Sequence, residues 1–204
     1  MDLASAVAVR FTQITRKSNY PIHPKHLLTD KPWYLKFFKK KDLIIDLGCG
    51  NGQSTIKSSK YCQKIIGIDI DKKLIEMART QASKSEISNL SFEPGNLETK
   101  LKYGDKFFDK VLFLDVLEHL VERDQILEEI KRILKDRGLL IVGVPNSRSS
   151  WKKLQRSVGI CSFSDPYHKT EYSEKSIKNL LKKHGFKIIY FGYGSFDTPL
   201  RGIF

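Results

Sequence analysis

Short apolar runs recur along the chain and are separated by stretches of mixed polarity. Six of the runs have the length of buried β-strands: residues 43–45, 64–68, 90–92, 110–114, 139–144 and 187–191. Most of them are continuously apolar, which is typical of strands that are covered on both faces. The pattern therefore predicts a mostly parallel sheet between two layers of helices.

The stretches between the runs carry apolar side chains at helical spacing. Three groups of residues each share one helical face: Leu74, Met77 and Ala78; Ile126, Ile130, Ile133 and Leu134; and Ile177, Leu180 and Leu181. Gly138 and Gly185 stand where two helices are expected to end, and Ser173 is a suitable N-cap for the last helix. Alternating strands and helices predict an α/β, Rossmann-like fold with helices on both faces, in which ligands bind at the carboxyl ends of the strands.

Length and composition indicate one compact domain. The chain has 204 residues, of which 40% are hydrophobic and 29% charged. No stretch approaches the ~20 apolar residues of a membrane-spanning helix, and residues 1–10 lack the basic leader and apolar core of a signal peptide. We therefore expect a cytoplasmic protein. The three cysteines are odd in number and show no Cys-x-x-Cys spacing, which argues against a disulfide framework or a zinc-cysteine site.

The net charge of +13 favours an acidic partner, such as RNA, a phosphorylated substrate or an anionic membrane surface. However, only nine of the 36 basic residues are arginine, and the lysines are spread along the chain. Recognition of phosphates and bases relies on the planar, forked guanidinium of arginine more than on lysine. Nucleic-acid binding is therefore possible but not favoured.

A glycine-rich segment follows the first apolar run: Asp46-Leu47-Gly48-Cys49-Gly50-Asn51-Gly52. Glycines at a strand-to-helix turn let the backbone approach a ligand closely, and the helix that follows offers free N–H groups. The spacing is Gly-x-Gly-x-Gly, which differs from the Gly-x-Gly-x-x-Gly of dinucleotide-binding folds. Asp69 ends the second run, where a carboxylate can accept hydrogen bonds from both hydroxyls of a ribose.

The fourth run ends in Asp115-Val116-Leu117-Glu118-His119, and the fifth ends in Pro145-Asn146. Together with the glycine segment and Asp69, these motifs resemble the class I S-adenosylmethionine-dependent methyltransferases, in particular those of quinone biosynthesis and related small-molecule enzymes. The resemblance covers residues 40–192. It implies S-adenosylmethionine as cofactor, S-adenosylhomocysteine as product and a seven-stranded type of sheet. The seventh strand is doubtful, because only residues 193–204 follow the sixth run.

The resemblance also assigns the cofactor to loops at the carboxyl ends of the strands. Gly48, Cys49 and Gly50 are expected to pass beside the methionyl part, and Asp69 to hold the ribose. Asn96 stands in the place of an acidic residue that contacts the adenine amino group, and its amide oxygen can accept the same hydrogen bond. The complete expected set is Asp46, Gly48, Cys49, Gly50, Asn51, Gly52, Asp69, Ile70, Asn96, Leu97, Leu114, Asp115, Val116 and His119.

Two histidines are candidates for a general base. His119 is expected beside the cofactor sulfonium, and His168 lies in the connection after the fifth run, which in this family commonly forms the substrate pocket. His119 can equally orient its loop or bind the cofactor carboxylate. Asp115, Glu118 and His119 are close enough in sequence for a divalent metal site. Such a group at a helix start is more often a cap with an ion pair, so no metal is expected.

These observations predict a single methyltransferase domain over residues 1–204. A helical cap or lid is expected at 1–40, a cofactor-binding core at 41–146, and a substrate-side insertion with the last helix and strand at 147–204. Substrate or lid contacts are expected from Tyr20, His23, His26, Trp151, Tyr167 and Tyr172. The predicted activity is methylation of a small molecule, first of all at oxygen, in quinone, lipid, glycan or secondary metabolism, by a monomer or a homodimer. The alternatives are an RNA methyltransferase and a cofactor-binding subunit that activates a partner enzyme without catalysis.

Overall fold

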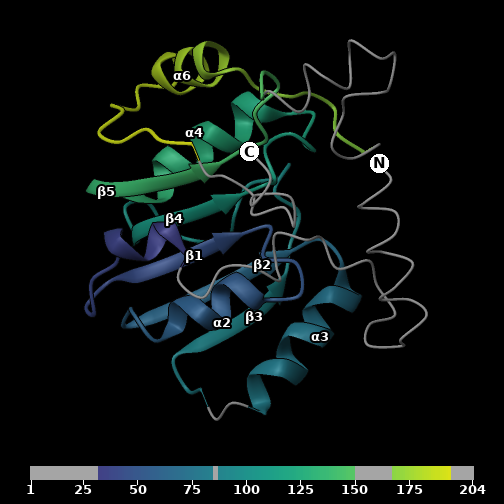
Figure 1. The fold of residues 1–204 in the computed structure, drawn as a ribbon. Coiled ribbons are helices and arrows are strands. Elements are labelled where there is room, and N and C mark those ends of the chain that lie inside the picture. Colours follow the sequence, from purple (N-terminus) through teal and green to yellow (C-terminus); the bar gives the residue numbers. More distant parts are fainter. Residues whose placement is uncertain (1–31, 85–86, 150–166, 194–204) are drawn as a thin grey trace, which may run out of the picture. The chain divides into compact units, whose positions relative to one another are not determined.

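The computed structural model describes residues 32–84, 87–149 and 167–193, so the predicted contacts of Tyr20, His23, His26 and Trp151 lie outside the described residues. The elements in chain order are η2 (Trp33–Phe37), β1 (Leu43–Leu47), α2 (Gln53–Ser59), β2 (Lys64–Asp69), α3 (Lys72–Ser83), β3 (Leu90–Pro94), β4 (Phe108–Leu114), α4 (Arg123–Ile133), β5 (Leu134–Gly143) and α6 (Glu174–Lys183) (Figure 1). None of these helices is long and apolar enough to cross a membrane.

The chain divides into two compact units. One unit is Lys36–Ile188, which holds β1 to β5 and the α-helices named above. The other unit combines Met1–Leu35 with Ile189–Phe204. The sheet and the candidate site both belong to the first unit.

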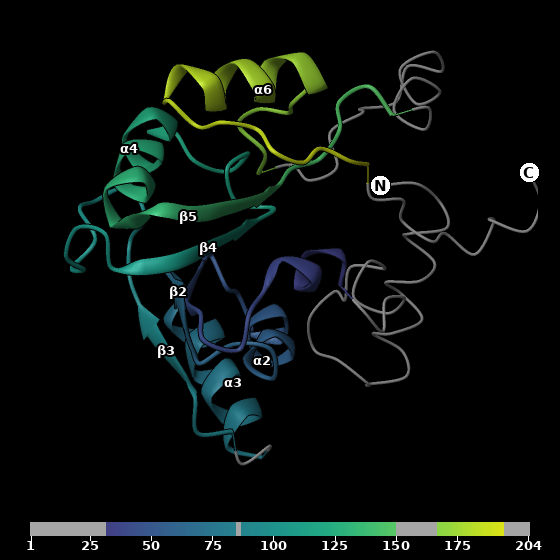
Figure 2. The ribbon, with the colours of Figure 1, turned by 90° about the vertical axis from the view of Figure 1, so that its left-hand side faces the viewer.

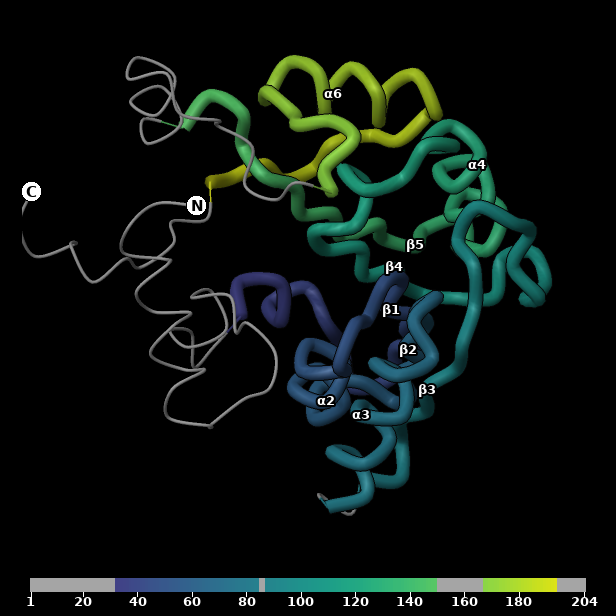
Figure 3. Tube along the Cα trace, turned by 90° about the vertical axis from the view of Figure 1, so that its right-hand side faces the viewer, coloured from purple at the N-terminus to yellow at the C-terminus, as the bar shows by residue number. Residues whose placement is uncertain are grey.

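The five strands form one parallel sheet in the order β3-β2-β1-β4-β5 (Figure 3). β1 lies in the centre and pairs with both β2 and β4. The chain runs outward from β1 through β2 to β3, and then returns to β4 and β5 on the other side of β1. The carboxyl ends of β1 and β4 are therefore neighbours at the point where the strand order reverses, which is where ligands bind in open parallel sheets. The parallel sheet predicted from the apolar runs is confirmed.

Helices cover both faces of the sheet, with α4 and α6 on one face and α2 and α3 on the other (Figure 2). Successive residues of β1 alternate between the faces. Ile45 and Leu47 pack in the cluster that contains residues of α4 and α6, whereas Ile44 packs with Cys62 and Ile65 on the opposite face. The alternation follows from the two-residue period of a strand, and it places apolar side chains in both layers.

The buried faces of the helices agree largely with the sequence pattern. Ile126, Ile130 and Ile133 of α4 are buried as predicted. In α3 the buried face is displaced by one residue, because it consists of Ile75, Ala78 and Ala82, while Leu74 and Met77 are half-buried.

Helix α6 has both end signals that the sequence predicted. Ser173 caps the N-terminus, and its Oγ accepts a hydrogen bond from the N–H of Ser176 at 3.2 Å. At the other end Gly185 has a φ of 74°, and its N–H donates to the carbonyl of Lys182 while Phe186 N–H donates to that of Leu181. This pair of hydrogen bonds is a Schellman motif, in which the left-handed residue favours glycine.

The sixth predicted strand is wrong, because residues 187–191 are described and form no strand. Ile189, Tyr190 and Phe191 are 66%, 50% and 38% exposed. An apolar run reports a local preference, and a strand forms only where a neighbouring strand supplies the ladder hydrogen bonds. Within the described residues β5 pairs with β4 alone, so the sheet ends there.

The prediction that a helix ends near Gly138 is also wrong. Helix α4 ends at Ile133, and Leu134 already belongs to β5, where it pairs with Phe108. The register between β4 and β5 shifts after this pair, and Gly138 lies in the irregular stretch before Leu139. The burial of Leu134 against β4 therefore outweighs the local preference of Gly138 for a helix end.

Candidate active site

The glycine-rich segment forms the turn between β1 and α2 at the carboxyl edge of the sheet (Figure 1). Gly48, Gly50 and Gly52 have positive φ angles of 75°, 54° and 80°. Residues with a Cβ rarely adopt such angles, so this backbone path requires glycine. The N–H groups of Gly48 and Cys49 donate to the carbonyl of Ile68 at 2.8 and 2.9 Å, which holds the turn against the end of β2.

Gly48 is also the point where the turn after β1 contacts the turn after β4. A Cβ atom at Gly48 would lie 2.3 Å from Cγ2 of Val116 and 2.9 Å from its Cγ1. An added Cβ at Gly50, in contrast, would meet no atom of the described residues within 4 Å. The turn is therefore closed toward β4 at Gly48 and open at Gly50, where it can admit part of a ligand.

Asp69 is held beside this turn by the backbone. Its Oδ2 accepts a hydrogen bond from Gly50 N–H at 2.8 Å, and its Oδ1 accepts one from Asp71 N–H at 2.9 Å. A carboxylate offers about four acceptor positions, so each oxygen can accept one more hydrogen bond. Ile70, also a predicted cofactor residue, is 67% exposed next to it. The carboxylate is thus oriented by the protein and keeps capacity for two hydroxyl donors.

Asp46 is enclosed by protein at the end of β1. Thr55 of α2 donates a hydrogen bond from its Oγ1 to Oδ2 of Asp46 at 2.6 Å, and both side chains are buried. Burial raises the pKa of Asp46 to about 7; the Thr55 hydrogen bond opposes this shift and the charge of Asp69 adds to it. Direct contact of Asp46 with the cofactor stays a prediction. Nothing in the sequence indicated that Thr55 would donate this hydrogen bond to Asp46.

We expect Asp46→Asn to become more stable, relative to the native protein, as the pH rises. The pKa of Asp46 is about 7 in the folded protein against 3.8 for an ordinary aspartate, so the fold retains a proton that the unfolded chain releases. The native protein therefore loses stability as the pH rises from about 4 to about 7, whereas an asparagine does not titrate.

Urea unfolding without cofactor measures this effect. Between about pH 5.5 and about pH 8, the difference in unfolding free energy should move by roughly 2 kcal/mol in favour of the variant. The other titrating groups are common to both proteins and largely cancel in the difference, apart from those coupled to Asp46, such as Asp69. A difference that does not change with pH would mean that Asp46 is ionised in the fold throughout this range.

Asn96 and Leu97 follow β3 and differ in burial. Asn96 is exposed, and its Oδ1 accepts a hydrogen bond from Glu98 N–H at 2.9 Å. Leu97 is 6% exposed and belongs to the main hydrophobic cluster. The predicted adenine contact of the Asn96 oxygen must therefore use its second acceptor position.

The turn after β4 begins at Asp115, directly behind Leu114. Asp115 has a φ of 54°, and its N–H donates to the carbonyl of Gly143 at 2.9 Å. A left-handed angle is costly for a residue with a Cβ and is typical of functional sites. The strained position lies next to Val116, the residue that contacts Gly48.

The two candidate bases, His119 and His168, lie side by side although 49 positions separate them in the sequence. Their ring centroids are 4.7 Å apart, with the ring planes at 76°. Oε1 of Glu118 lies 3.9 Å from Nε2 of His168, and Oε1 of Glu171 lies 3.4 Å from Nδ1 of the same ring. The side chains of Glu118, His168 and Glu171 are 0%, 5% and 6% exposed.

Backbone hydrogen bonds fix the segment that carries His168. The N–H groups of Lys169 and Thr170 donate to the carbonyl of Glu118 at 2.8 and 3.2 Å. The N–H of Ser147 donates to the carbonyl of Tyr172 at 2.8 Å, next to an isolated parallel bridge between Asn146 and Tyr172. The segment is thus attached to the turns after both β4 and β5.

The two tyrosines predicted to contact substrate differ in their surroundings. Tyr167 is 75% exposed, whereas Tyr172 is 6% exposed. The hydroxyl of Tyr172 is buried and has no hydrogen-bond partner among the described residues. Burial raises the pKa of Tyr172 to about 12, while the charge of Arg123 opposes the shift and that of Glu118 adds to it. Tyr172 is therefore a neutral hydroxyl near physiological pH.

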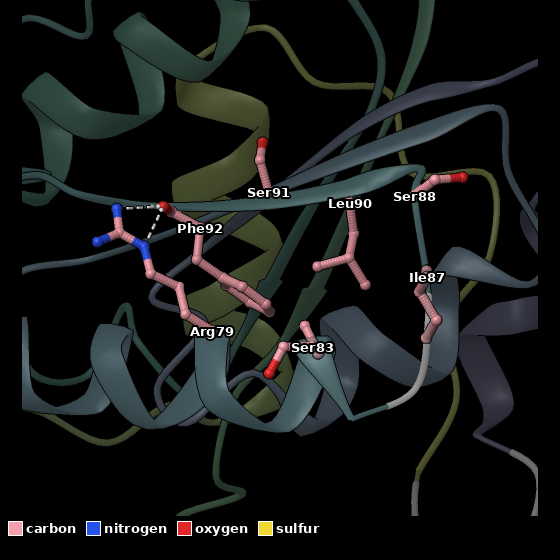
Figure 4. Close-up of a pocket in the computed structure, with 8 residues that line it drawn as sticks. Arg79, Ser83, Ile87, Ser88, Leu90, Ser91 and Phe92 are labelled. Atoms are coloured by element: carbon pink, nitrogen blue, oxygen red, sulfur yellow. Dashed lines mark hydrogen bonds between the residues drawn. The ribbon is translucent and has the colours of Figure 1, made fainter.

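A cavity of about 470 Å³ lies elsewhere, between α3 and β3 (Figure 4). Arg79 reaches along it, and its Nε and Nη2 donate to the carbonyl of Phe92 at 3.2 and 2.8 Å. None of the predicted cofactor or catalytic residues lines this cavity, so it is separate from the site at the carboxyl ends of the strands.

Residues 38–189 match a family model described as a methyltransferase domain. The chain belongs to this family. Its parallel sheet and the order of its motifs identify the class I type, whose cofactor is S-adenosylmethionine, as predicted from the sequence.

Among curated proteins the chain is similar to a probable methyltransferase, ltbC, of Aspergillus luteorubrus, with 33% identity over 122 residues. It is also similar to the ubiquinone biosynthesis O-methyltransferase of Pelagibacter ubique, with 31% identity over 118 residues. These matches cover 55% and 58% of this chain but only 43% and 45% of the relatives, so the chain spans less than half of their length. A solved S-adenosylmethionine-dependent methyltransferase of Methanosarcina mazei has a TM-score of 0.67 and 26% identity, and the similarity covers 84% of this chain and 92% of that one.

Proposed function

We propose that this chain transfers the methyl group of S-adenosylmethionine to an oxygen atom of a small molecule. The observation that carries the proposal is the contact of His119 with His168 at the carboxyl edge of the sheet, with ring centroids 4.7 Å apart. A carboxylate is methylated without proton removal and an amine attacks through its own lone pair, whereas a hydroxyl must lose its proton. The relative from Pelagibacter ubique is named as an O-methyltransferase, which supports the same choice of atom.

The residues around the glycine turn fit the cofactor. The open side of the turn at Gly50 leaves room for the methionyl part, and Asp69 has acceptor capacity for the two ribose hydroxyls. Asn96 and Leu97 are assigned to the adenine. When bound, S-adenosylmethionine supplies a methyl group that the adjoining sulfonium makes electrophilic.

The protein residues then have two tasks, to orient the acceptor and to assist loss of its proton. Orientation of reacting groups is worth effective molarities of ~10⁵ to 10⁸ M, and a general base adds roughly 10²- to 10⁴-fold in rate. The carboxylate of Glu171 lies 3.4 Å from Nδ1 of His168, which turns Nε2 of that ring toward Glu118. His119 and His168 are thus the groups assigned to the acceptor hydroxyl.

Two measurements test the proposal. Calorimetry should show one-to-one binding of S-adenosylmethionine and of S-adenosylhomocysteine, and methyl-labelled cofactor should transfer label to a hydroxyl in a panel of phenols, hydroxy acids, sugars and lipids. No binding of either cofactor form overturns the proposal, and so does label found only on nitrogen. Label found only in tRNA, with binding that weakens steeply as salt increases, would establish the RNA methyltransferase alternative instead.

A further inference from the structure

Glu118, His119 and His168 form a compact group of metal-ligating side chains. Each offers one donor atom, a carboxylate oxygen or an imidazole nitrogen, and the three atoms lie within 4.8 Å of one another. From the sequence no metal is expected, and the group considered there was Asp115, Glu118 and His119. The structure instead brings His168 to Glu118 and His119, from a segment that follows β5 by more than twenty residues.

The surroundings of His168 are those of a metal ligand. Its Nδ1 lies 3.4 Å from the carboxylate of Glu171, and its Nε2 points to Glu118. Histidines that bind metals usually contact a carboxylate or carbonyl through the second ring nitrogen, which fixes the ring and its tautomer. This contact is independent of the three-residue group and leaves Nε2 as the nitrogen that can bind a cation.

The distances leave room for a cation between the three donor atoms. Nε2 of His168 and Oε1 of Glu118 are 3.9 Å apart, which exceeds the length of a hydrogen bond. Around a metal ion with bonds of about 2.0 to 2.2 Å, neighbouring ligand atoms lie about 3 to 3.5 Å apart. Side-chain movements of about 1 Å would therefore bring the three donors to coordinating distance.

The backbone holds the two halves of the group together before any ion binds. Lys169 and Thr170 donate their N–H groups to the carbonyl of Glu118, and His119 N–H donates to the carbonyl of Val116 at 2.9 Å. The side chain of Glu118 is completely buried, so its oxygens are shielded from bulk solvent. Glu118 is buried and the two histidines are of intermediate exposure, so two imidazoles and one carboxylate are held together where a divalent cation can still take an outside ligand.

We propose that Glu118, His119 and His168 bind a divalent first-row transition-metal ion, whose remaining coordination positions take the hydroxyl of the methyl acceptor. Two imidazoles with one carboxylate favour ions such as Zn²⁺ or Mn²⁺ over Mg²⁺, which prefers oxygen ligands. This inference rests on the proposed function and specifies how the same site recognises its acceptor.

The chemistry balances without any oxidant or reductant. The acceptor hydroxyl releases its proton to water, and its oxygen forms a bond to the methyl carbon. The carbon–sulfur bond breaks and its electron pair stays on sulfur, which leaves S-adenosylhomocysteine. In this arrangement His119 and His168 act as ligands, and neither has to accept the proton.

Metal binding is tested on the full chain after treatment with chelator. Titration with Co²⁺, followed by its visible absorption, and calorimetry with Zn²⁺ should each show one site. Glu118→Gln and His168→Gln should weaken binding by about 100-fold or more, and Glu171→Gln by about 10- to 100-fold because it removes the group that orients His168. Glu122→Gln is the matched control, since Glu122 is an exposed glutamate on the same turn and should leave the affinity unchanged.

The outcomes separate this inference from the proposed function. If the chain binds S-adenosylmethionine but shows no single Co²⁺ or Zn²⁺ site, the inferred metal site is refuted and the methyltransferase proposal stands. Equal affinity in the native protein and in His168→Gln also overturns it. His168→Gln decides the question if the buried change in Glu118→Gln prevents folding. If methyl transfer continues after complete metal removal, the metal does not take part in the reaction and this inference is refuted. His119 and His168 would then be the proton acceptors.

Discussion

Asp69→Asn is expected to weaken the binding of S-adenosylmethionine and of S-adenosylhomocysteine by about 10- to 100-fold. In the native protein Oδ2 accepts from Gly50 N–H and Oδ1 from Asp71 N–H, and one acceptor position remains on each oxygen. Asparagine keeps one oxygen but replaces the other by an NH₂ donor, which faces a hydroxyl donor and carries no charge. Hydrogen bonds to charged groups are worth about 1.5 to 3 kcal/mol, so loss of one accounts for the expected change.

Asp71→Asn is the matched control for this measurement. Asp71 is an exposed carboxylate two positions away, and its Oδ1 accepts from the N–H groups of Lys73 and Leu74 at the start of α3. Asparagine caps helices as well as aspartate, so this variant should keep both its fold and its affinity. Calorimetry with both cofactor forms gives the two affinities. If Asp69→Asn binds within about twofold of the native protein, the ribose is held elsewhere.

Gly48→Ala is expected to lower the unfolding free energy by about 3 kcal/mol or more. Two effects add at this position. A left-handed backbone angle costs a non-glycine residue about 1 to 3 kcal/mol, and φ is 75° here. The new methyl group would also lie 2.3 Å from Cγ2 of Val116. Overpacking of this kind costs roughly a further 1 to 3 kcal/mol.

Two further variants separate these effects in the same unfolding experiment. Gly50→Ala has a comparable φ of 54° but meets no described atom within 4 Å, so it should lose only the strain energy. Adding Val116→Ala to Gly48→Ala removes the two clashing methyl groups and should recover at least about 1 kcal/mol relative to the sum of the single changes. Additive effects of the two changes would show that the turns after β1 and β4 do not press on each other.

The fold was predictable where the local sequence pattern agrees with the packing around the segment. The runs that became β1, β2 and β4 are mostly apolar because both faces of these strands are covered. Ser173 and Gly185 bound α6 through hydrogen bonds within a few residues. Residues 187–191 are just as apolar, yet they form no strand. Nothing in a single segment specifies whether a neighbouring strand will pair with it.

The candidate site also has a part that could be predicted from the sequence and a part that could not. The glycines and Asp69 were recognisable because the turn after β1 needs positive φ angles and because a carboxylate at the end of β2 faces that turn. The hydrogen bond between Asp46 and Thr55 and the contact of Glu171 with His168 were not recognisable in the sequence, because neither the residue types nor their spacing indicates them. Burial and distance create these interactions only after the helices pack on the sheet.

The parallel sheet followed from the periodicity of strands and helices in the sequence alone. The family and its S-adenosylmethionine cofactor followed from the resemblance of the ordered motifs to class I methyltransferases. Only the tertiary structure decided that Val116 closes against Gly48, and that His168 joins Glu118 and His119 in one compact group. The physical reason is that the three donors come from two turns whose distance is set by the pairing of β4 with β5 and by the hydrogen bonds of residues 169 and 170 to Glu118.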